Sequence, residues 1–336
     1  MATMRDVARR AGVSPMTVSN VVNGHENVRP ETRARVLAAI TELGYRMNTA
    51  ARGLRRGRSG IIAIAVSTVA SPYEGMISAA LAEQVARAGY DPVIELTGHR
   101  RAGELDAITH SLLRDHDGLI LHSAHLDEHD LPLLRGRHPV VVLSEREYDE
   151  GFDQVLLSNV DGARAATTHL LDAGCTRPGM IGGRSTPQGH EDVLSVRAQG
   201  YRRALEDRAL PLVPSAVLPA PYTFAGGAAA AHELLEEHPR TDGIFCATDV
   251  LAVGALRALH ERGLRVPEDV KVIGFDGLDL GRYSTPSLSS VVPDHAALAR
   301  VPVELLLTRL RGERLAEDHR REVIAFRLEE RESTRR

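Results

Sequence analysis

Residues 3–22 read TMRDVARRAGVSPMTVSNVV and carry the signals for two short helices joined by a tight turn. Thr3 and Asp6 have the spacing of a helix-capping box, and apolar residues then recur at intervals of three and four. Gly12 suits the position just after a helix, because glycine adopts the left-handed backbone conformation without steric cost. Ser14 is a favourable N-cap for the second helix. The stretch therefore predicts helix, turn and helix.

A third helix is predicted to begin at Pro30 and to end at Gly44. Two short helices joined by a glycine-containing turn and braced by a third form a helix-turn-helix.

Residues 1–60 contain eleven arginines and four acidic residues, a charge of +7. The whole chain carries −4, so the remaining residues carry −11. A basic end on an acidic body indicates that this end meets a polyanion; a solvated arginine-rich face is the alternative.

In a helix-turn-helix, the second helix enters the DNA major groove and presents its outward side chains to base edges. Asn20 can pair with adenine through its side-chain amide. The expected base-contacting residues are Pro15, Met16 and Asn20. The expected phosphate-contacting residues, which set register without reading sequence, are Arg5, Thr17, Ser19, Asn27, Thr32 and Arg33. A solvated helix face or a cap is the alternative for each, and Ser14 is interpreted as a cap alone.

A long ungapped motif carries a resemblance to a known family. The pattern DVAxxAGVSxxTVSxVVN over residues 6–23 is followed by PETRxxV over residues 30–36 and by LGY over residues 43–45. This combination resembles the DNA-binding headpiece of the LacI/GalR family of bacterial transcription regulators. The resemblance implies a regulator whose body binds a small effector.

The stretch from Asn48 to Arg56 resembles the hinge of the same family. The resemblance implies a short helix that inserts Leu54 into the minor groove of the operator, with Arg55 beside it. Such a short segment, weakened by Gly53, is expected to fold only against a surface. The expected domains are a headpiece over residues 1–46, a hinge and linker over 47–59, and an effector-binding and dimerisation domain over 60–336.

The body is predicted to be an α/β structure. Short apolar runs such as 61–66, 118–121 and 243–246 alternate with amphipathic helical stretches, which is typical of βαβ units around a parallel sheet. The resemblance implies the periplasmic-binding-protein type I fold, with two doubly wound parallel-sheet lobes and a cleft between them. The expected lobes comprise residues of about 60–160 and 291–320 for the first, and about 161–290 and 321–330 for the second.

Ligands of open α/β sheets bind beyond the carboxyl ends of the strands, and this rule selects several polar residues of the body. The resemblance assigns effector binding to an arginine, an aspartate and a stacking aromatic among them. The candidates are Tyr73, Ser123, Asn159, Arg197, Tyr222, Thr248 and Asp276. Acidic, arginine and tyrosine side chains suit a polyhydroxylated ligand such as a sugar. As structural alternatives, Asp249 is an equally good helix N-cap, and Asp276 with Gly277 suits a plain turn.

These features predict a sequence-specific repressor of carbohydrate-utilisation genes that a small sugar releases from a pseudo-palindromic operator. A repressor that needs a purine-type corepressor is the alternative, and a solute-binding protein without a regulatory role is a further one. One recognition helix offers about two base contacts of ~1–3 kcal/mol each. Specific binding usually requires ~4–10 kcal/mol, so a homodimer on double-stranded DNA is expected.

Other functional classes are disfavoured. No catalytic motif and no cofactor motif is apparent, so no enzyme is expected. The five histidines between residues 116 and 138 include the spacing HxxHxxxH, which could hold zinc, but they are interpreted as solvated side chains and no metal site is expected. Two cysteines, Cys175 and Cys246, are too few for a disulfide framework. No signal peptide or membrane span is apparent, so a cytoplasmic protein is expected.

Overall fold

The computed structural model divides the chain into two compact units, Met1–Ser59 and Gly60–Arg336. The structure describes residues 2–22, 27–45, 58–114, 116–127, 129–134, 138–144, 147–148, 151–184, 193–313 and 318–335. The hinge residues Leu54 and Arg55 lie outside this set, so their predicted role stays a prediction.

The first unit contains three helices, α1 (Met4–Ala11), α2 (Pro15–Val22) and α3 (Pro30–Leu43). One valine from each helix, Val7, Val18 and Val36, is fully buried in their common core. The predicted capping box is present, because the Thr3 hydroxyl accepts from the Asp6 amide while the Thr3 amide donates to Asp6 Oδ2 at 2.9 Å. Gly12 ends α1 in the left-handed conformation, with φ of 63°.

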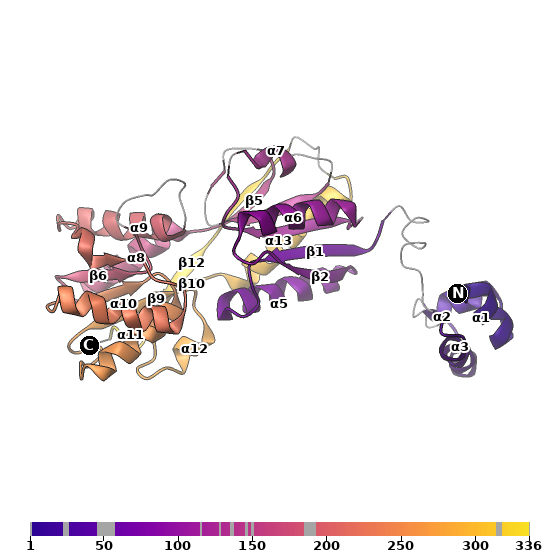
Figure 1. Cartoon of the computed structure of the whole chain (residues 1–336), viewed down its shortest axis with the longest axis horizontal. Coiled ribbons are helices and arrows are strands. Elements are labelled where there is room, and N and C mark those ends of the chain that lie inside the picture. The colour runs from indigo at the N-terminus through magenta and orange to yellow at the C-terminus, as the bar shows by residue number, and fades with distance from the viewer. Residues whose placement is uncertain are drawn as a thin grey trace. The chain divides into compact units, whose positions relative to one another are not determined.

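The second unit consists of two lobes, each built around its own six-stranded sheet (Figure 1). The sheet of lobe one has the order β11-β5-β4-β3-β1-β2, and all of its strands are parallel. Its strands are β1 (Ile61–Val66), β2 (Asp91–Leu96), β3 (Gly118–Ser123), β4 (Val140–Ser144), β5 (Asp153–Leu157) and β11 (Arg321–Ile324). Its helices are α5 (Pro72–Arg87), α6 (Arg101–Leu113), α7 (Leu131–Leu134) and α13 (His295–Leu310).

The sheet of lobe two has the order β12-β10-β9-β8-β6-β7 and is parallel except for β12, which is antiparallel to β10. Its strands are β6 (Pro178–Ile181), β7 (Val217–Leu218), β8 (Gly243–Cys246), β9 (Lys271–Phe275), β10 (Ser289–Pro293) and β12 (Phe326–Glu329). Its helices are α8 (Asn159–Asp172), α9 (Val193–Asp207), the 3-10 turn η1 (Pro214–Ala216), α10 (Phe224–Glu237), α11 (Asp249–Glu261) and α12 (Asp279–Arg282).

The apolar pattern of β1 explains why helices cover both faces of its sheet. Ile62 and Ile64 belong to the core formed with α5 and α13, whereas Ala63 and Ala65 belong to the core formed with α6. Successive side chains of a strand point to opposite faces, so a continuous apolar run requires cover on both sides. The run IIAIAV therefore specifies a central strand of a doubly covered sheet.

No helix among the described residues is long and apolar enough to cross a membrane.

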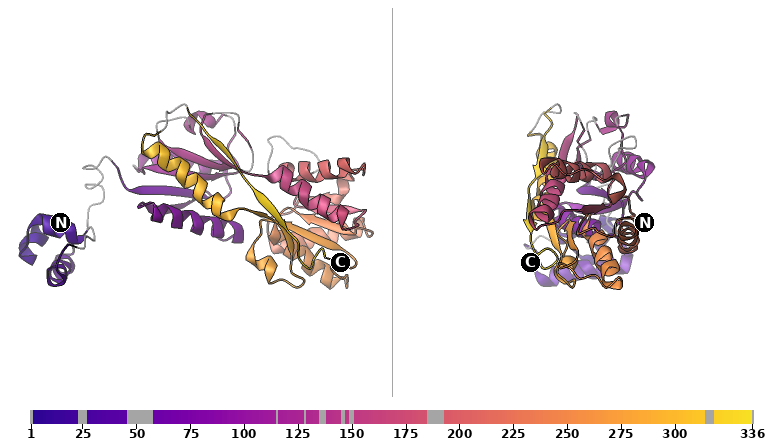
Figure 2. Two further views of the ribbon diagram at one scale, coloured as in Figure 1. Left: turned by 180° about the vertical axis from the view of Figure 1, so that it is seen from behind. Right: turned by 90° about the vertical axis from the view of Figure 1, so that its left-hand side faces the viewer.

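The chain passes between the lobes after β5, after β10 and between β11 and β12 (Figure 2). The expectation that residues 321–330 belong wholly to the second lobe is wrong. Arg321–Ile324 pairs with β5 of lobe one, and the chain reaches lobe two only after Ala325. The expectation that lobe one resumes at residue 291 is also wrong. Ser289–Pro293 lies in lobe two, and the chain crosses to lobe one at Asp294. Short edge strands give a weak sequence signal, because their burial depends on pairing with distant strands.

Candidate functional site

A cavity of about 760 Å³ lies between the two lobes, beyond the carboxyl ends of β1 and β3 in lobe one and of β8 and β9 in lobe two. This is the place where open parallel sheets bind ligands, and the volume is in the range of small-molecule sites. Of the seven residues predicted to bind an effector, five line the cavity: Tyr73, Arg197, Tyr222, Thr248 and Asp276. Asn159 and Ser123 are not among the lining residues.

Arg197, in the first half of α9, is held in place from several directions. Its Nε donates to Asn159 Oδ1 at 3.0 Å, and its Nη1 donates to the Ala247 carbonyl. The same Nη1 lies 3.4 Å from Asp276 Oδ1, and the guanidinium stacks on Phe275 with Cζ 3.7 Å from the ring centroid. A planar cation fixed by fork-like hydrogen bonds and an aromatic face is pre-oriented for a polar ligand. Asn159 thus contacts Arg197, which lines the cavity, and does not itself line it.

Asp276 follows β9 in an unusual backbone conformation, with φ of 115°. Its amide donates to the Val291 carbonyl at 2.9 Å. Gly277 is also at positive φ and lies so close to Val292 that a Cβ would approach it to 2.6 Å. A non-glycine residue at such a φ costs of order 1–3 kcal/mol and persists only where its surroundings hold it. The pair Asp276–Gly277 is therefore more than a plain turn.

The buried carboxylate of Asp249 accepts hydrogen bonds that hold the loop after β9. Asp249 Oδ2 accepts from the Leu278 amide at 2.7 Å, and Oδ1 accepts from the Ser290 hydroxyl at 2.6 Å. Ser290 Oγ in turn accepts from the Gly277 amide at 3.1 Å. Burial raises the pKa of Asp249 to about 7. Asp249 is not the N-cap of α11: the Thr248 hydroxyl fills that role by accepting from the Leu251 amide at 3.2 Å.

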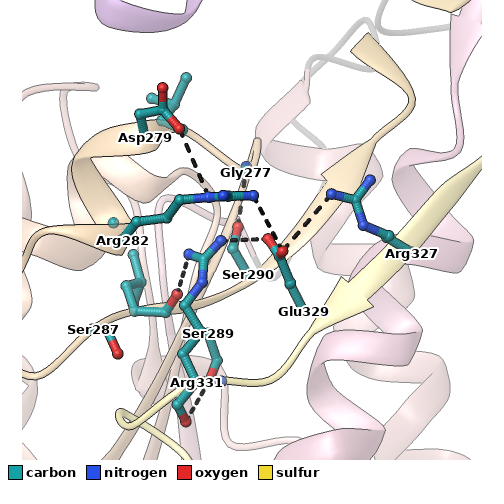
Figure 3. A network of polar contacts seen from close by, with 12 residues as sticks. Gly277, Asp279, Arg282, Ser287, Ser289, Ser290, Arg327, Glu329 and Arg331 are labelled. Carbon is teal, nitrogen blue, oxygen red and sulfur yellow. Dashed lines mark hydrogen bonds and ion pairs between the residues drawn. The ribbon is translucent and has the colours of Figure 1, made fainter. Parts of the chain in front are cut away.

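Side chains of the last strand, β12, form ion pairs close to the loop that contains Gly277 (Figure 3). Glu329 of β12 forms ion pairs with Arg282 at 3.3 Å, with Arg327 at 3.8 Å and with Arg331. Arg331 also donates to the Leu288 carbonyl at 2.7 Å. Figure 3 shows the three arginines converging on Glu329 next to the loop that contains Gly277. Residues distant in sequence therefore connect β12 to α12 and to the Leu288 carbonyl, close to the loop that contains Gly277.

The lobe-one wall of the cavity is rich in aromatic and imidazole rings. The rings of Tyr73 and His122 are 6.2 Å apart, and His125 also lines the cavity. The interpretation of residues 116 to 138 as solvated histidines is wrong for His116 and His122, which are both buried. Within the described residues, no group of three His, Cys, Asp or Glu is arranged to hold a metal ion.

The prediction that Ser123 binds the effector is not supported by its position. Ser123 is fully buried, and its hydroxyl donates to Glu104 Oε2 at 2.8 Å. Glu104 is buried as well and accepts from the amides of Ala124, His125 and Leu126, at 3.0, 3.1 and 3.2 Å. A carboxylate with this many donors orders the loop after β3. Sequence reasoning missed Glu104, because it lies within a helix and only the tertiary fold brings the loop to it.

The helix-turn-helix presents its predicted DNA-facing residues with differing exposure. Met16 is 71% exposed, and Pro15, Arg5 and Asn27 are exposed as well. The remaining candidates are partly buried: Thr17, Ser19, Asn20, Thr32 and Arg33. Ser14 caps α2, since its Oγ accepts from the Thr17 amide at 3.1 Å. The contacts of these residues with DNA stay predictions.

A helix-turn-helix joined to a two-lobed body with a ligand-sized cavity defines a class, the DNA-binding regulators controlled by a small molecule. Residues 3–48 match the family described as bacterial regulatory proteins, lacI family, and residues 167–334 match the periplasmic binding protein-like domain. The chain belongs to the LacI family, whose members are transcriptional regulators and not enzymes.

Individual relatives cover nearly the whole chain. The chain is 32% identical over 316 residues to the ribose operon repressor of Haemophilus influenzae, which covers 93% of each chain. A structure of the transcriptional regulator CelR in complex with cellobiose has a TM-score of 0.73 and 32% identity, covering 99% of this chain and 100% of that one. The lac repressor dimer bound to operator has a TM-score of 0.80 and 26% identity, covering 99% of each.

Proposed function

We propose that the protein is a repressor that a small neutral sugar releases from its operator. The observation that carries the proposal is the cavity wall in which Arg197 and Asp276 stand side by side, both almost fully buried. A fixed donor next to a fixed acceptor suits adjacent hydroxyl groups, which both donate and accept. The formally charged residues of the lining are Glu74, Asp276 and Arg197, which favours a neutral ligand over an anionic one.

The aromatic residues of the lining support the same ligand class. Tyr73 stands in lobe one, and Tyr222 and Phe224 stand at the rim in lobe two. Aromatic faces cover the C–H side of a sugar ring. These same rings also favour a second candidate, a purine-type corepressor, because a base stacks on aromatic faces. The two candidates differ in the sign of the effect on DNA binding.

A ligand panel distinguishes the candidates. We expect a neutral mono- or disaccharide to raise the melting temperature of the full chain, since a ligand at 100 times its Kd stabilises the folded state by about 2.7 kcal/mol. The Arg197→Ala variant should lose this shift. A shift with purine bases and none with sugars would favour the corepressor and reject the inducing sugar.

On the DNA side, we propose that α2 reads bases through Pro15, Met16 and Asn20 and that Leu54 enters the minor groove at the operator centre with Arg55 beside it. A ligand that alters the closure of the lobes changes the spacing of the two hinges of a dimer, and this links the cavity to DNA affinity. A full switch needs ~5.5 kcal/mol of differential affinity, which two effectors per dimer can supply at ~1–3 kcal/mol each.

We further propose that two copies pair through lobe one. Ile94 and Leu96 lie on β2, the edge strand of its sheet, and Leu96 is 61% exposed. Leu113 at the end of α6 is 77% exposed. An exposed apolar edge strand is a typical site of contact with another protein chain, because the contact buries its apolar side chains. Sedimentation of the double variant Leu96→Arg/Leu113→Arg should give a monomer where the unmodified chain gives a dimer.

A DNA-binding regulator acts where the chromosome is, and we accordingly propose a cytoplasmic location.

A further inference from the structure

His295 links the helix of one lobe to a cavity residue of the other. It is the first residue of α13, directly after the chain leaves lobe two at Asp294. Its Nε2 lies 2.7 Å from the main-chain carbonyl oxygen of Asp276. A carbonyl oxygen only accepts, so Nε2 carries the proton and donates. The contact therefore joins the N-terminus of a lobe-one helix to the residue whose carboxylate lies 3.4 Å from Arg197 Nη1.

The acceptor of this bond belongs to the strained part of the site. The Asp276 carbonyl is half of the peptide unit that continues into Gly277, and both residues are at positive φ. From lobe two, the Val291 carbonyl and the Ser290 hydroxyl hold the amides of Asp276 and Gly277, at 2.9 and 3.1 Å. The imidazole of His295 holds the opposite, carbonyl side of the same segment. Strained segments persist where surrounding contacts over-determine them, and His295 is one of these contacts.

The surroundings of His295 disfavour the protonated ring. Burial lowers the pKa of His295, and the positive charge of Arg327 acts in the same direction. The hydrogen bond to Asp276 and the carboxylates of Asp294 and Asp279 act in the opposite direction. Burial has the largest effect, so the ring is neutral near pH 7 with its proton on Nε2. One N–H is then available for the Asp276 carbonyl.

We propose that His295 is a positioning residue that holds the Asp276–Leu278 segment in its ligand-ready conformation and ties that conformation to α13 of lobe one. The ligand-binding part of this inference rests on the proposed function. A ligand that contacts Asp276 then acts directly on the helix at the crossover, without a relay through either sheet. Loss of the bond removes the hold on the carbonyl side of the segment, so its amide hydrogen bonds to Val291, Ser290 and Asp249 should open more often.

The first test uses the full chain without any ligand. Amide hydrogen exchange of Asp276, Gly277 and Leu278 is compared in the unmodified chain, His295→Ala and His295→Gln. Glutamine places an amide N–H at about the reach of Nε2. We expect about tenfold faster exchange in His295→Ala, the scale of one lost hydrogen bond, and exchange within about threefold of the unmodified chain in His295→Gln.

Exposed His260 on α11 supplies the matched control, and His260→Ala should leave the exchange of the segment unchanged. Amides of β1 should exchange alike in all variants, which separates local release from general destabilisation. Unchanged exchange in His295→Ala, or equal acceleration in the alanine and glutamine variants, would overturn the proposal.

The second test adds the ligand, with cellobiose and D-ribose as the probes. For the sugar that the unmodified chain binds, we expect His295→Ala to raise the Kd about tenfold and His295→Gln to raise it less than threefold. An equal Kd in the alanine variant would contradict the ligand-binding part. If neither sugar binds the unmodified chain, the proposed sugar ligand is in question, whereas the exchange experiment still decides the role of His295.

Discussion

Arg197 Nε donates to Asn159 Oδ1 at 3.0 Å, and each of the two residues is only 2% exposed. Asn159 begins α8, directly after the first crossing between the lobes, whereas Arg197 lies on α9 and lines the cavity. The amide oxygen thus fixes the guanidinium from behind and leaves its other edge to Ala247 and Asp276. The arginine is oriented before any ligand arrives.

This relationship predicts a graded pair of variants. Asn159→Ala should weaken binding of the sugar by about tenfold or more, because a hydrogen bond to a charged group contributes about 1.5–3 kcal/mol. Arg197→Ala should abolish detectable binding and also destabilise the fold, because Asp276 then keeps a buried charge without its partner. Calorimetric titration and thermal unfolding measure the two effects. Equal affinities for Asn159→Ala and the unmodified chain would reject the positioning role of Asn159.

The recognition helix predicts a separation between specificity and affinity. Asn20→Ala should cost about 1–3 kcal/mol on the preferred duplex and little on a scrambled one, because base readout is lost. Arg5→Ala should weaken both duplexes alike and reduce the salt dependence of binding, because a phosphate contact is lost. Fluorescence anisotropy at two salt concentrations distinguishes these outcomes. A uniform loss for Asn20→Ala would show that it does not read bases.

The capping box of α1 predicts a local effect on the helix-turn-helix. Hydrogen bonds from Thr3 hold the pKa of Asp6 below its ordinary value. Thr3→Ala removes the hydroxyl that accepts from the Asp6 amide, and N-cap losses of this kind cost about 0.5–2 kcal/mol. Hydrogen exchange of the α1 amides in the full chain reports the change. Thr41→Ala is the matched control, since its hydroxyl donates to the Leu37 carbonyl within α3 and does not cap α1.

A half-buried histidine of lobe one predicts a pH dependence of stability. Burial lowers the pKa of His138, and the nearby His116 adds to this effect. His138 Nε2 is 2.8 Å from the Ser111 hydroxyl. Because the folded state disfavours the protonated ring, the stabilisation is present above the unfolded pKa of about 6.5 and is lost as the pH falls below it.

The comparison with His138→Gln isolates this contribution. The free energy of unfolding of the unmodified chain should fall relative to the glutamine variant between pH 7.5 and pH 5.5. The difference should be smaller than the limit of about 1.4 kcal/mol per pH unit, because the ring is only half-buried. A rise in the free energy of unfolding of the unmodified chain relative to the glutamine variant as the pH falls would contradict the prediction, because the folded state would then favour the protonated ring.

Much of the architecture follows from local signals in the sequence. The capping box, the left-handed Gly12 and the run IIAIAV each specify their element without reference to the rest of the chain. The rule for strand ends also locates Tyr73, Thr248 and Asp276 at the cavity, because a parallel sheet brings those ends to one edge. Local chemistry is sufficient for these residues.

The remainder depends on contacts between distant segments. Ser123 also stands at the carboxyl end of a strand, yet its hydroxyl donates to Glu104 of α6 and the residue does not line the cavity. His122 lines the cavity although its neighbouring histidines suggest a solvated surface. The chain crosses between the lobes at Ala325 because β11 and β12 pair with strands of different sheets. A partner that only the tertiary fold brings close leaves no periodic trace in the sequence.

The most direct test is a titration of a fluorescent duplex, selected from genomic DNA by the protein itself, with and without the sugar that raises the melting temperature most. We expect at least a thousandfold preference for this duplex over a scrambled one at physiological salt. We also expect that the sugar weakens this binding at least tenfold and that Arg197→Ala binds the duplex but does not respond. Equal binding of both duplexes, or an affinity for the selected duplex that no cavity ligand changes, would show that the protein is not an effector-controlled, sequence-specific repressor.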